Sequence, residues 1–324
     1  MSGSMETNTT EEDSFTTMHE ILNVSSMVVL SGICLLGITG NGLVIWFVAF
    51  RMKKTVNSVW FLSVAFADFT FSLFLPLTIT YIALSYYWPF GTFMCKLNRF
   101  SIYLNMSASV LQLTVISIDR CISVVFPIWC RNHRTVRLAV KVILAIWIIS
   151  LLLNVFYFIN THIYDVGDEF VYCLDNWVMH DVHIVLFVIA FTIIIFCYTV
   201  IFLRIRRNHR VTSNKPFKVI AAVIISFFIC WFPYHVFAIM SSYGSKTWNP
   251  NIWLVIAIGR SISSLLAYSN SCVNPLLYVF IGQDFKQKLW SAIKSGFERT
   301  FIEETNLTDQ NRHRFLPNLA ISQM

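Results

Sequence analysis

The run Asn274-Pro275-Leu276-Leu277-Tyr278 lies near the end of the last of seven long apolar stretches in a chain of 324 residues. A second polar run, Asp119-Arg120-Cys121, lies at the end of the third stretch. Charged groups are costly inside a bilayer, so a membrane helix rarely keeps one without a task. The two runs, on these two stretches, favour a signalling receptor over a pore or an enzyme.

The apolar stretches are long enough to cross about 30 Å of hydrocarbon. Only 13% of the residues are charged, whereas a soluble domain usually carries about 25%. We predict an all-α membrane protein, a seven-transmembrane helix bundle that covers 27–281. The expected spans are 27–50, 58–84, 93–126, 137–159, 180–204, 217–243 and 251–280.

The two ends of the chain are polar. Residues 1–26 are predicted to form an extracellular N-terminal tail, and residues 296–324 a cytoplasmic tail; both are expected to be mobile. The first 26 residues lack the charged start and apolar block of a cleavable signal peptide. The first span is therefore expected to act as its own insertion signal.

The net charge of +7 is unevenly distributed along the chain. The N-terminal tail and the segment between the fourth and fifth spans are acidic, and the alternate loops are basic. Loops rich in Lys and Arg stay in the cytoplasm, which places the N-terminus outside. The basic clusters adjoin spans, so they favour anchoring to anionic lipid or docking of a cytosolic partner over nucleic-acid binding. They comprise Arg51, Lys53, Lys54, Arg131, Arg134, Arg137, Arg204, Arg206, Arg207, Arg210 and Lys215.

Of the eight cysteines, only Cys95 and Cys173 are expected outside the membrane on the extracellular side. An oxidising compartment should join them, which would pin the loop before the fifth span over the mouth of the bundle. The alternative is two free thiols. Asn8 and Asn23 begin glycosylation sequons on the same side, and Asn8 is the better candidate because Asn23 is near the membrane.

Several polar residues recur inside the spans. Asp68 is in the second span, and a buried carboxylate needs hydrogen-bond donors or a cation. Two interpretations stay open: a bound Na⁺, or a protonated carboxyl group in a hydrogen-bonded cluster that only supports packing. The residues expected around Asp68 are Asn41, Ser109, Asn270 and Asn274.

Proline interrupts the last two spans. Pro233 and Pro275 each remove a backbone hydrogen bond and bend a helix. A bend would let a small shift at Trp231 become a larger movement at the inner end of the sixth span; a static kink is the alternative. Asp119 and Arg120 can pair while the bundle is closed, and Arg120 can then meet a partner when the span moves.

The chain resembles the rhodopsin-like (class A) G-protein-coupled receptors over about 27–295, and within them the chemoattractant subgroup of formyl-peptide and chemerin receptors. The motifs that carry the resemblance are GNGLVIW (40–46), KKTVN (53–57), VWFL (59–62), WPFG (88–91), DRCISV (119–124), NHRTV (132–136), CWFPYH (230–235) and YVFIGQDF (278–285).

The resemblance implies a ligand-driven change that starts at Trp231 and Pro233 and opens the sixth span for nucleotide exchange on a heterotrimeric G protein, mostly of the inhibitory type. Asp119, Arg120, Asn274, Pro275 and Tyr278 would belong to this switch. Arrestin is a further implied partner, and residues 282–295 resemble the short amphipathic helix 8 that lies along membrane lipids. The family uses no cofactor beyond a possible allosteric Na⁺.

The chain also departs from its relatives. Formyl-peptide receptors carry an acid where this chain has Tyr103, and two arginines where it has Val178 and Val182. Recognition of formyl-methionine by that pattern is therefore not expected. Ala190 replaces the usual proline of the fifth span, so the bulge of that span should be missing.

Two features of the outer face bear on the ligand. The acidic tail and loop would attract a basic peptide, and Arg99 and Arg260 could bind a carboxylate. A peptide with a basic body and a free C-terminus suits both features, and a lipid acid only the second. The expected wall of the cavity, for which packing alone is the alternative, is Tyr81, Trp88, Tyr103, Asn105, Tyr234, His235 and Phe237.

Other classes of protein fit less well. His133, His180 and His183 show no paired metal-ligand spacing, so an enzyme is not expected. A transporter would show repeated halves with broken helices, which the sequence lacks. A scavenger or decoy receptor of the same fold, which binds ligand without signalling, remains the alternative to a signalling receptor at the plasma membrane.

Overall fold

The computed structural model describes residues 3–165, 171–174, 180–207, 215–244, 250–281, 291 and 294. Met1–Leu277 forms one compact unit and Tyr278–Met324 a second. The bundle described below belongs to the first. The predicted helix 8 at 282–295 and the tail at 296–324 lie outside the described residues, apart from 291 and 294, and so does the side chain of Tyr278.

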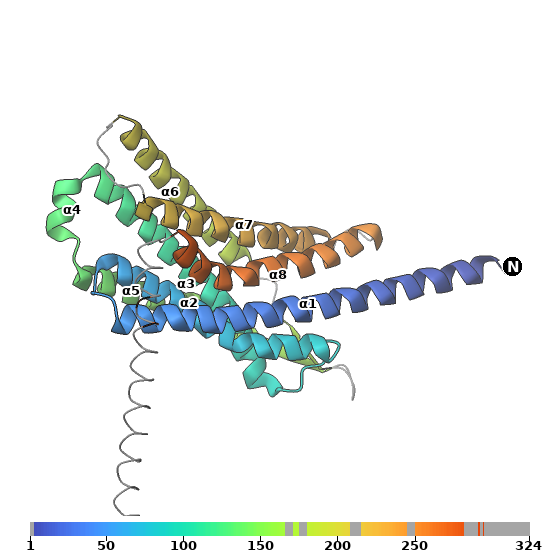
Figure 1. Ribbon diagram of the computed structural model, residues 1–324. Coiled ribbons are helices and arrows are strands. Elements are labelled where there is room, and N and C mark those ends of the chain that lie inside the picture. The colour runs from blue at the N-terminus through green and yellow to red at the C-terminus, as the bar shows by residue number, and fades with distance from the viewer. Residues whose placement is uncertain are drawn as a thin grey trace, which may run out of the picture. The chain divides into compact units, whose positions relative to one another are not determined.

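Seven helices in the described part of the chain are long and apolar enough to cross a membrane (Figure 1). This confirms the predicted seven-span bundle. The helices are α1 (Gly3–Phe50), α2 (Val56–Ala83), α3 (Gly91–Val125), α5 (Val136–Asn160), α6 (His180–Arg207), α7 (Lys215–Gly244) and α8 (Pro250–Ile281). Their apolar portions begin and end within a few residues of the predicted spans, except at the start of α1.

Helix α1 continues into the segment predicted to be a tail. It begins at Gly3, although its membrane-length apolar part begins at Glu20. The hydroxyl group of Tyr86, in the turn after α2, donates to Asn23 Oδ1 at 3.0 Å. Burial raises the pKa of the Tyr86 phenol, which keeps it a donor. This bond ties the end of α2 to the first helix at one of the two predicted sequons.

Helix α3 is the central helix of the bundle, since it packs against α2, α5 and α6. It buries polar residues along its length, including Asn98, Asn105, Ser109 and Gln112. Polar groups are tolerated in such a helix where they face neighbouring helices instead of lipid. The residues that the sequence singles out therefore converge on α3.

The sequence analysis did not predict a short helix and a two-stranded hairpin. Helix α4 (Pro127–His133) begins with proline at its first position, where the missing N–H would have no partner in any case. Strands β1 (His162–Asp165) and β2 (Val171–Leu174) form an antiparallel hairpin with Ile163 opposite Cys173. Helix α6 runs without a break, and Ala190 is buried in it, as the missing proline led us to expect.

Candidate functional site

A polar cluster occupies the middle of the bundle, with Asp68 at its centre. Asp68 is fully buried, and Asn274 Nδ2 donates to its Oδ2 at 2.8 Å. Asn41 Nδ2 donates to the carbonyl of Ser271 at 2.7 Å. Glycine at 40 favours the close approach of α1 to α8, because a Cβ there would lie only 3.0 Å from Pro275 Cβ. These contacts join α1 and α2 to α8.

Helix α3 enters the same cluster through two side chains. Asn105 Nδ2 donates to Ser271 Oγ at 3.3 Å, and the Ser109 hydroxyl donates to Asn105 Oδ1 at 3.4 Å. Asn105 was predicted to line the ligand cavity; the structure shows its bonds to these polar groups, and its contact with a ligand stays a prediction. Ser271 connects α1, α3 and α8, and the sequence analysis did not single it out.

The donor set of this cluster fits a small hard cation. Among the described side chains, four buried oxygens of the cluster have no hydrogen-bond partner: Asn41 Oδ1, Asp68 Oδ1, Asn270 Oδ1 and Asn274 Oδ1. Carboxylate and amide oxygens are the ligands that hard cations take. Within the same described residues, no group of three His, Cys, Asp or Glu could hold a metal ion.

A layer of aromatic rings is formed by side chains of α6 and α7. Trp231 is buried, and its ring centroid lies 5.7 Å from that of Tyr234 and 6.1 Å from that of Phe227. One residue before it, Cys230 Sγ lies 3.7 Å from Ser269 Oγ of α8. Pro233 is inside α7 and Pro275 inside α8, so both proline-bearing helices contact the layer or the cluster.

Three basic and polar side chains surround Asp119 where α3 ends. Arg134 binds its carboxylate with two bonds, Nε to Oδ1 at 2.8 Å and NH2 to Oδ2 at 3.0 Å. The predicted pair with Arg120 is present at 3.8 Å but is the looser contact. Asn57 Oδ1 accepts from both Arg120 and Arg134. We call these four residues the arginine clasp.

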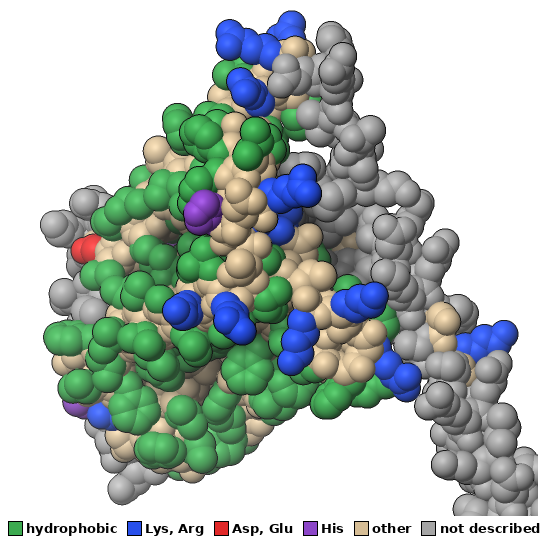
Figure 2. Space-filling view, turned by 90° about the vertical axis from the view of Figure 1, so that its left-hand side faces the viewer, with side chains coloured by type: hydrophobic (Ala, Val, Ile, Leu, Met, Phe, Trp, Pro, Cys, Tyr) green, Lys and Arg blue, Asp and Glu red, His purple; other side chains and the backbone are tan. Residues whose placement is uncertain are grey.

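The clasp lies at the basic end of the bundle, where α1, α3 and α6 end. Figure 2 looks toward that end and shows Lys and Arg side chains spread among hydrophobic ones, with almost no acidic side chain in view. Arg120 is only 7% exposed, so its charge is held inside the bundle by Asp119 and Asn57. A group held this way can be released when its partners move.

A disulfide bond closes the opposite end of the bundle. Cys95 and Cys173 are bonded, with their Cα atoms 5.7 Å apart, which confirms the predicted pair. Strand β2 is thereby fixed to α3. Trp88 packs against this end fully buried, and its Nε1 donates to the carbonyl of Gly91 at 2.9 Å. Tyr81 stacks edge-on against Trp88, with centroids 5.5 Å apart.

The two arginines expected to bind a carboxylate lie near the disulfide end on different helices. Arg99 NH2 donates to the carbonyl of Cys173 at 2.8 Å, so the side chain is held below the hairpin. Arg260 NH1 donates to Ser241 Oγ at 3.1 Å, which links α8 to α7. Both side chains are partly exposed.

The remaining predicted wall residues form aromatic contacts between α3, α6 and α7. Tyr103 is buried against His183, with ring centroids 5.2 Å apart. His235 packs against Phe187 at 4.4 Å. The ring of Phe237 lies against Gly259 of α8, where a Cβ would clash with it. His235 also lies one helical turn after Trp231, with the ring centroids 6.4 Å apart.

Residues 40–278 match the family model described as the 7 transmembrane receptor (rhodopsin family). The chain belongs to this family. Human chemerin-like receptor 1 is 39% identical over 319 residues, with 90% of this chain and 84% of the relative covered. Mouse formyl peptide receptor 2 is 38% identical over 318 residues (91% and 90%), and N-formyl peptide receptor 3 of Pongo pygmaeus 39% over 308 (88% and 88%).

Membership of the rhodopsin family confirms three predictions. The chain is a G-protein-coupled receptor of the chemoattractant group and a multi-pass protein of the plasma membrane. It is a receptor and not an enzyme, because its relatives are receptors. The family works with extracellular ligands and G proteins, whereas the type of ligand and of G protein for this receptor is taken up below.

Sequence reasoning missed four residues that contribute to the site. Ser271 directly follows Asn270 and comes three residues before Asn274, which at helical spacing puts it on the same side. Arg134 and Asn57 were visible as parts of quoted motifs, but nothing in the sequence indicated that they meet Asp119. His183 comes four residues before Phe187 and so shares its face of α6.

Proposed function

We propose that this receptor detects a chemoattractant-type ligand outside the cell, with a peptide preferred over a lipid acid, and activates an inhibitory heterotrimeric G protein. The observation that supports signalling most is the arginine clasp, in which Arg120 is buried and held by Asn57 of α2 and Asp119 of α3. A buried guanidinium with releasable partners is a two-state element that a ligand and a G protein can both bias.

The orientation follows from charge. The basic end carries exposed Arg131, Arg137 and Lys141 beside the clasp, and Lys and Arg accumulate on the cytoplasmic side. We therefore place the basic end in the cytoplasm and the N-terminus outside. The disulfide end then faces the oxidising side, which is where such a bond persists. Asn8 becomes available for glycosylation, whereas Asn23 lies in the membrane-length part of α1 and accepts a bond from Tyr86.

The ligand proposal rests on charges at the disulfide end. The outer segments are acidic and would speed the encounter with a basic peptide. Arg99 and Arg260 lie deeper and are partly exposed, so a C-terminal carboxylate could reach both. Charge-assisted bonds to a guanidinium are among the stronger hydrogen bonds.

We expect Arg99→Ala to lower the affinity for a peptide ligand by about tenfold or more, since a hydrogen bond to a charged group contributes roughly 1.5–3 kcal/mol. The measurement is displacement of labelled ligand on whole cells, with a screen of basic peptides, their C-terminal amides and lipid acids. Lys96→Ala is the matched control, because Lys96 lies three residues before Arg99 on the same helix and donates to the carbonyl of Ile159. Equal affinity for acid and amide forms would rule out the carboxylate role.

The cluster around Asp68 supports an allosteric Na⁺ in this receptor. Asp68, Ser109, Asn270 and Asn274 would supply the oxygens, and the bound ion would supply a positive charge that keeps the carboxylate ionised in the bundle. Asn274, which holds Asp68, belongs to α8, so the residues that bind the ion also hold the helices together.

Asp68→Asn is expected to abolish the effect of sodium on agonist affinity, because the amide keeps the shape of the side chain and removes its charge. In membranes of the native receptor, replacing Na⁺ by N-methylglucamine should change agonist affinity severalfold, within the roughly 5–150-fold that couplings between sites span. If agonist affinity still depends on sodium after the substitution, the cluster does not bind the ion and only supports helix packing.

A decoy receptor is the second candidate function. The observation that favours it is α6, which runs unbroken through Ala190, where the resemblance to the family implies a proline and a bulge. An unbent helix could reduce the movement that α7 makes beside it. A decoy would bind ligand with the affinity expected here and leave cAMP and calcium unchanged in the same cells.

A further inference from the structure

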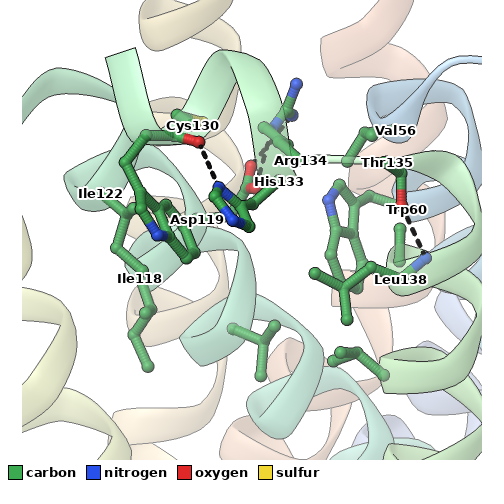
Figure 3. Close-up of a pocket in the computed structure, with 14 residues that line it drawn as sticks. Val56, Trp60, Ile118, Asp119, Ile122, Cys130, His133, Arg134, Thr135 and Leu138 are labelled. Carbon is green, nitrogen blue, oxygen red and sulfur yellow. Dashed lines mark hydrogen bonds and ion pairs between the residues drawn. The ribbon is translucent and has the colours of Figure 1, made fainter. Parts of the chain in front are cut away.

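A cavity lies under α4, far from Arg99 and Arg260 of the proposed ligand site. It is about 150 Å³ in volume and lies between α2, α3, α4 and α5. Figure 3 shows Trp60 and Leu138 on one side of it and Ile118 and Ile122 on the other. Most of its lining is apolar, and Asp119 and Arg134 of the clasp form part of its rim.

The size and lining of the cavity define what fits. An apolar protein cavity of roughly this volume stays dry and takes a molecule about the size of benzene. Leu138 and Trp129 on its border are 46% and 50% exposed, so the cavity opens to the outer surface of the bundle. A single aromatic ring or a short alkyl chain could enter it there.

A buried donor on a residue that lines the cavity favours an occupant that also carries an acceptor. Trp60 is only 3% exposed and lines the cavity, and among the described residues its Nε1 has no hydrogen-bond partner. Figure 3 shows this nitrogen at the edge of the ring that borders the cavity. A buried donor without a hydrogen bond costs free energy. An oxygen that bonds to it would therefore contribute more to binding than the same bond made in water.

The charges around the cavity favour an anionic acceptor. Between residues 115 and 142, Asp119 is the only acid, and Arg134 binds both of its oxygens. Arg131, Arg137 and Lys141 are exposed in the same segment. A cation would meet a net positive surface, whereas a carboxylate would be attracted.

We propose that this cavity binds a small carboxylic acid, with its apolar ring or chain among the side chains of α2, α3 and α5 and its carboxylate near Trp60 Nε1 and Arg134. Since Arg134 belongs to both the cavity and the clasp, occupancy and the contacts of Asp119 are thermodynamically linked. The site goes beyond the proposed ligand site and needs neither that ligand nor a G protein to be detected.

The test is photolabelling of the full-length receptor in phosphatidylcholine nanodiscs with trifluoromethyl-diazirinyl benzoate, followed by peptide mapping. The matched probe is the corresponding benzyl alcohol, which keeps the ring and lacks the charge. We expect the acid to label residues 115–142 and α2 near Trp60, and the alcohol to label them several times less. Competition by octanoate, or by phosphatidylserine placed in the disc, separates a free acid from a lipid head group as the natural source.

Two substitutions fill the cavity from opposite walls, Ala139→Phe and Val115→Phe. Each should reduce labelling by about tenfold or more, a loss equal to about 1.4 kcal/mol. Ala145→Phe on the exposed side of α5 is the control and should leave labelling unchanged. If both filled variants reach the cell surface and label like the native receptor, or if the alcohol labels as strongly as the acid, the proposed site is wrong.

Discussion

Asp119→Asn should raise ligand-independent signalling by about tenfold, equivalent to about 1.4 kcal/mol. The carboxylate holds Arg134 by two bonds and Arg120 by a looser pair, and the amide keeps the shape but loses the charge that both arginines need. The side chains of Asp119 and Arg134 are only 14% and 25% exposed, so water screens this pair less than a surface ion pair. The released Arg120 would favour the state that meets the G protein.

The measurement for Asp119→Asn is forskolin-stimulated cAMP in cells without added ligand, at matched surface expression. Asp181→Asn is the control, since Asp181 is an exposed acid at the other end of the bundle and should leave basal cAMP unchanged. Basal signalling equal to that of the native receptor would show that the clasp does not restrain Arg120.

Cys95→Ser should remove most of the receptor from the cell surface. The bond to Cys173 closes a loop with a sequence separation of 78 residues, and loss of a native disulfide typically costs 2–5 kcal/mol. The loss should also free strand β2 and the carbonyl that Arg99 binds. Receptor that still reaches the surface is therefore expected to bind ligand weakly.

Two quantities test Cys95→Ser. Flow cytometry of an N-terminally tagged receptor gives its level at the cell surface, and a binding assay gives the ligand bound per surface receptor. The double variant with Cys173→Ser should behave like the single one, because the two thiols act as one bond. Cys121→Ser, which changes a partly buried free cysteine, is the control. Native surface levels and native affinity in the double variant would contradict the structural role given to the hairpin.

The sequence could predict the seven spans because bilayer thickness imposes the length of each apolar stretch. It could also predict the disulfide, since the sidedness of the loops left only Cys95 and Cys173 on the oxidising side. Asp68 and Asn274 were expected to meet, and they do, at 2.8 Å. In each case a single strong constraint, set by the membrane, limits the possible answers.

The sequence could not predict contacts that depend on how helices rotate and where a loop folds back. Arg134 meets Asp119 only because α4 turns the chain back beneath α3. The bond between Asn105 of α3 and Ser271 of α8 was not predicted. Helix rotation is set by packing against neighbours, which a single sequence does not display.

The most direct test of signalling is ligand-stimulated nucleotide exchange on an inhibitory G protein in membranes that contain either the native receptor or Arg120→Ala. We predict robust exchange with the native receptor and none with the variant, while both bind labelled ligand. Arg120→Lys serves as the conservative variant and should restore part of the exchange, because it keeps the charge. Native receptor that binds ligand at the cell surface and drives no exchange would contradict the account and identify a decoy.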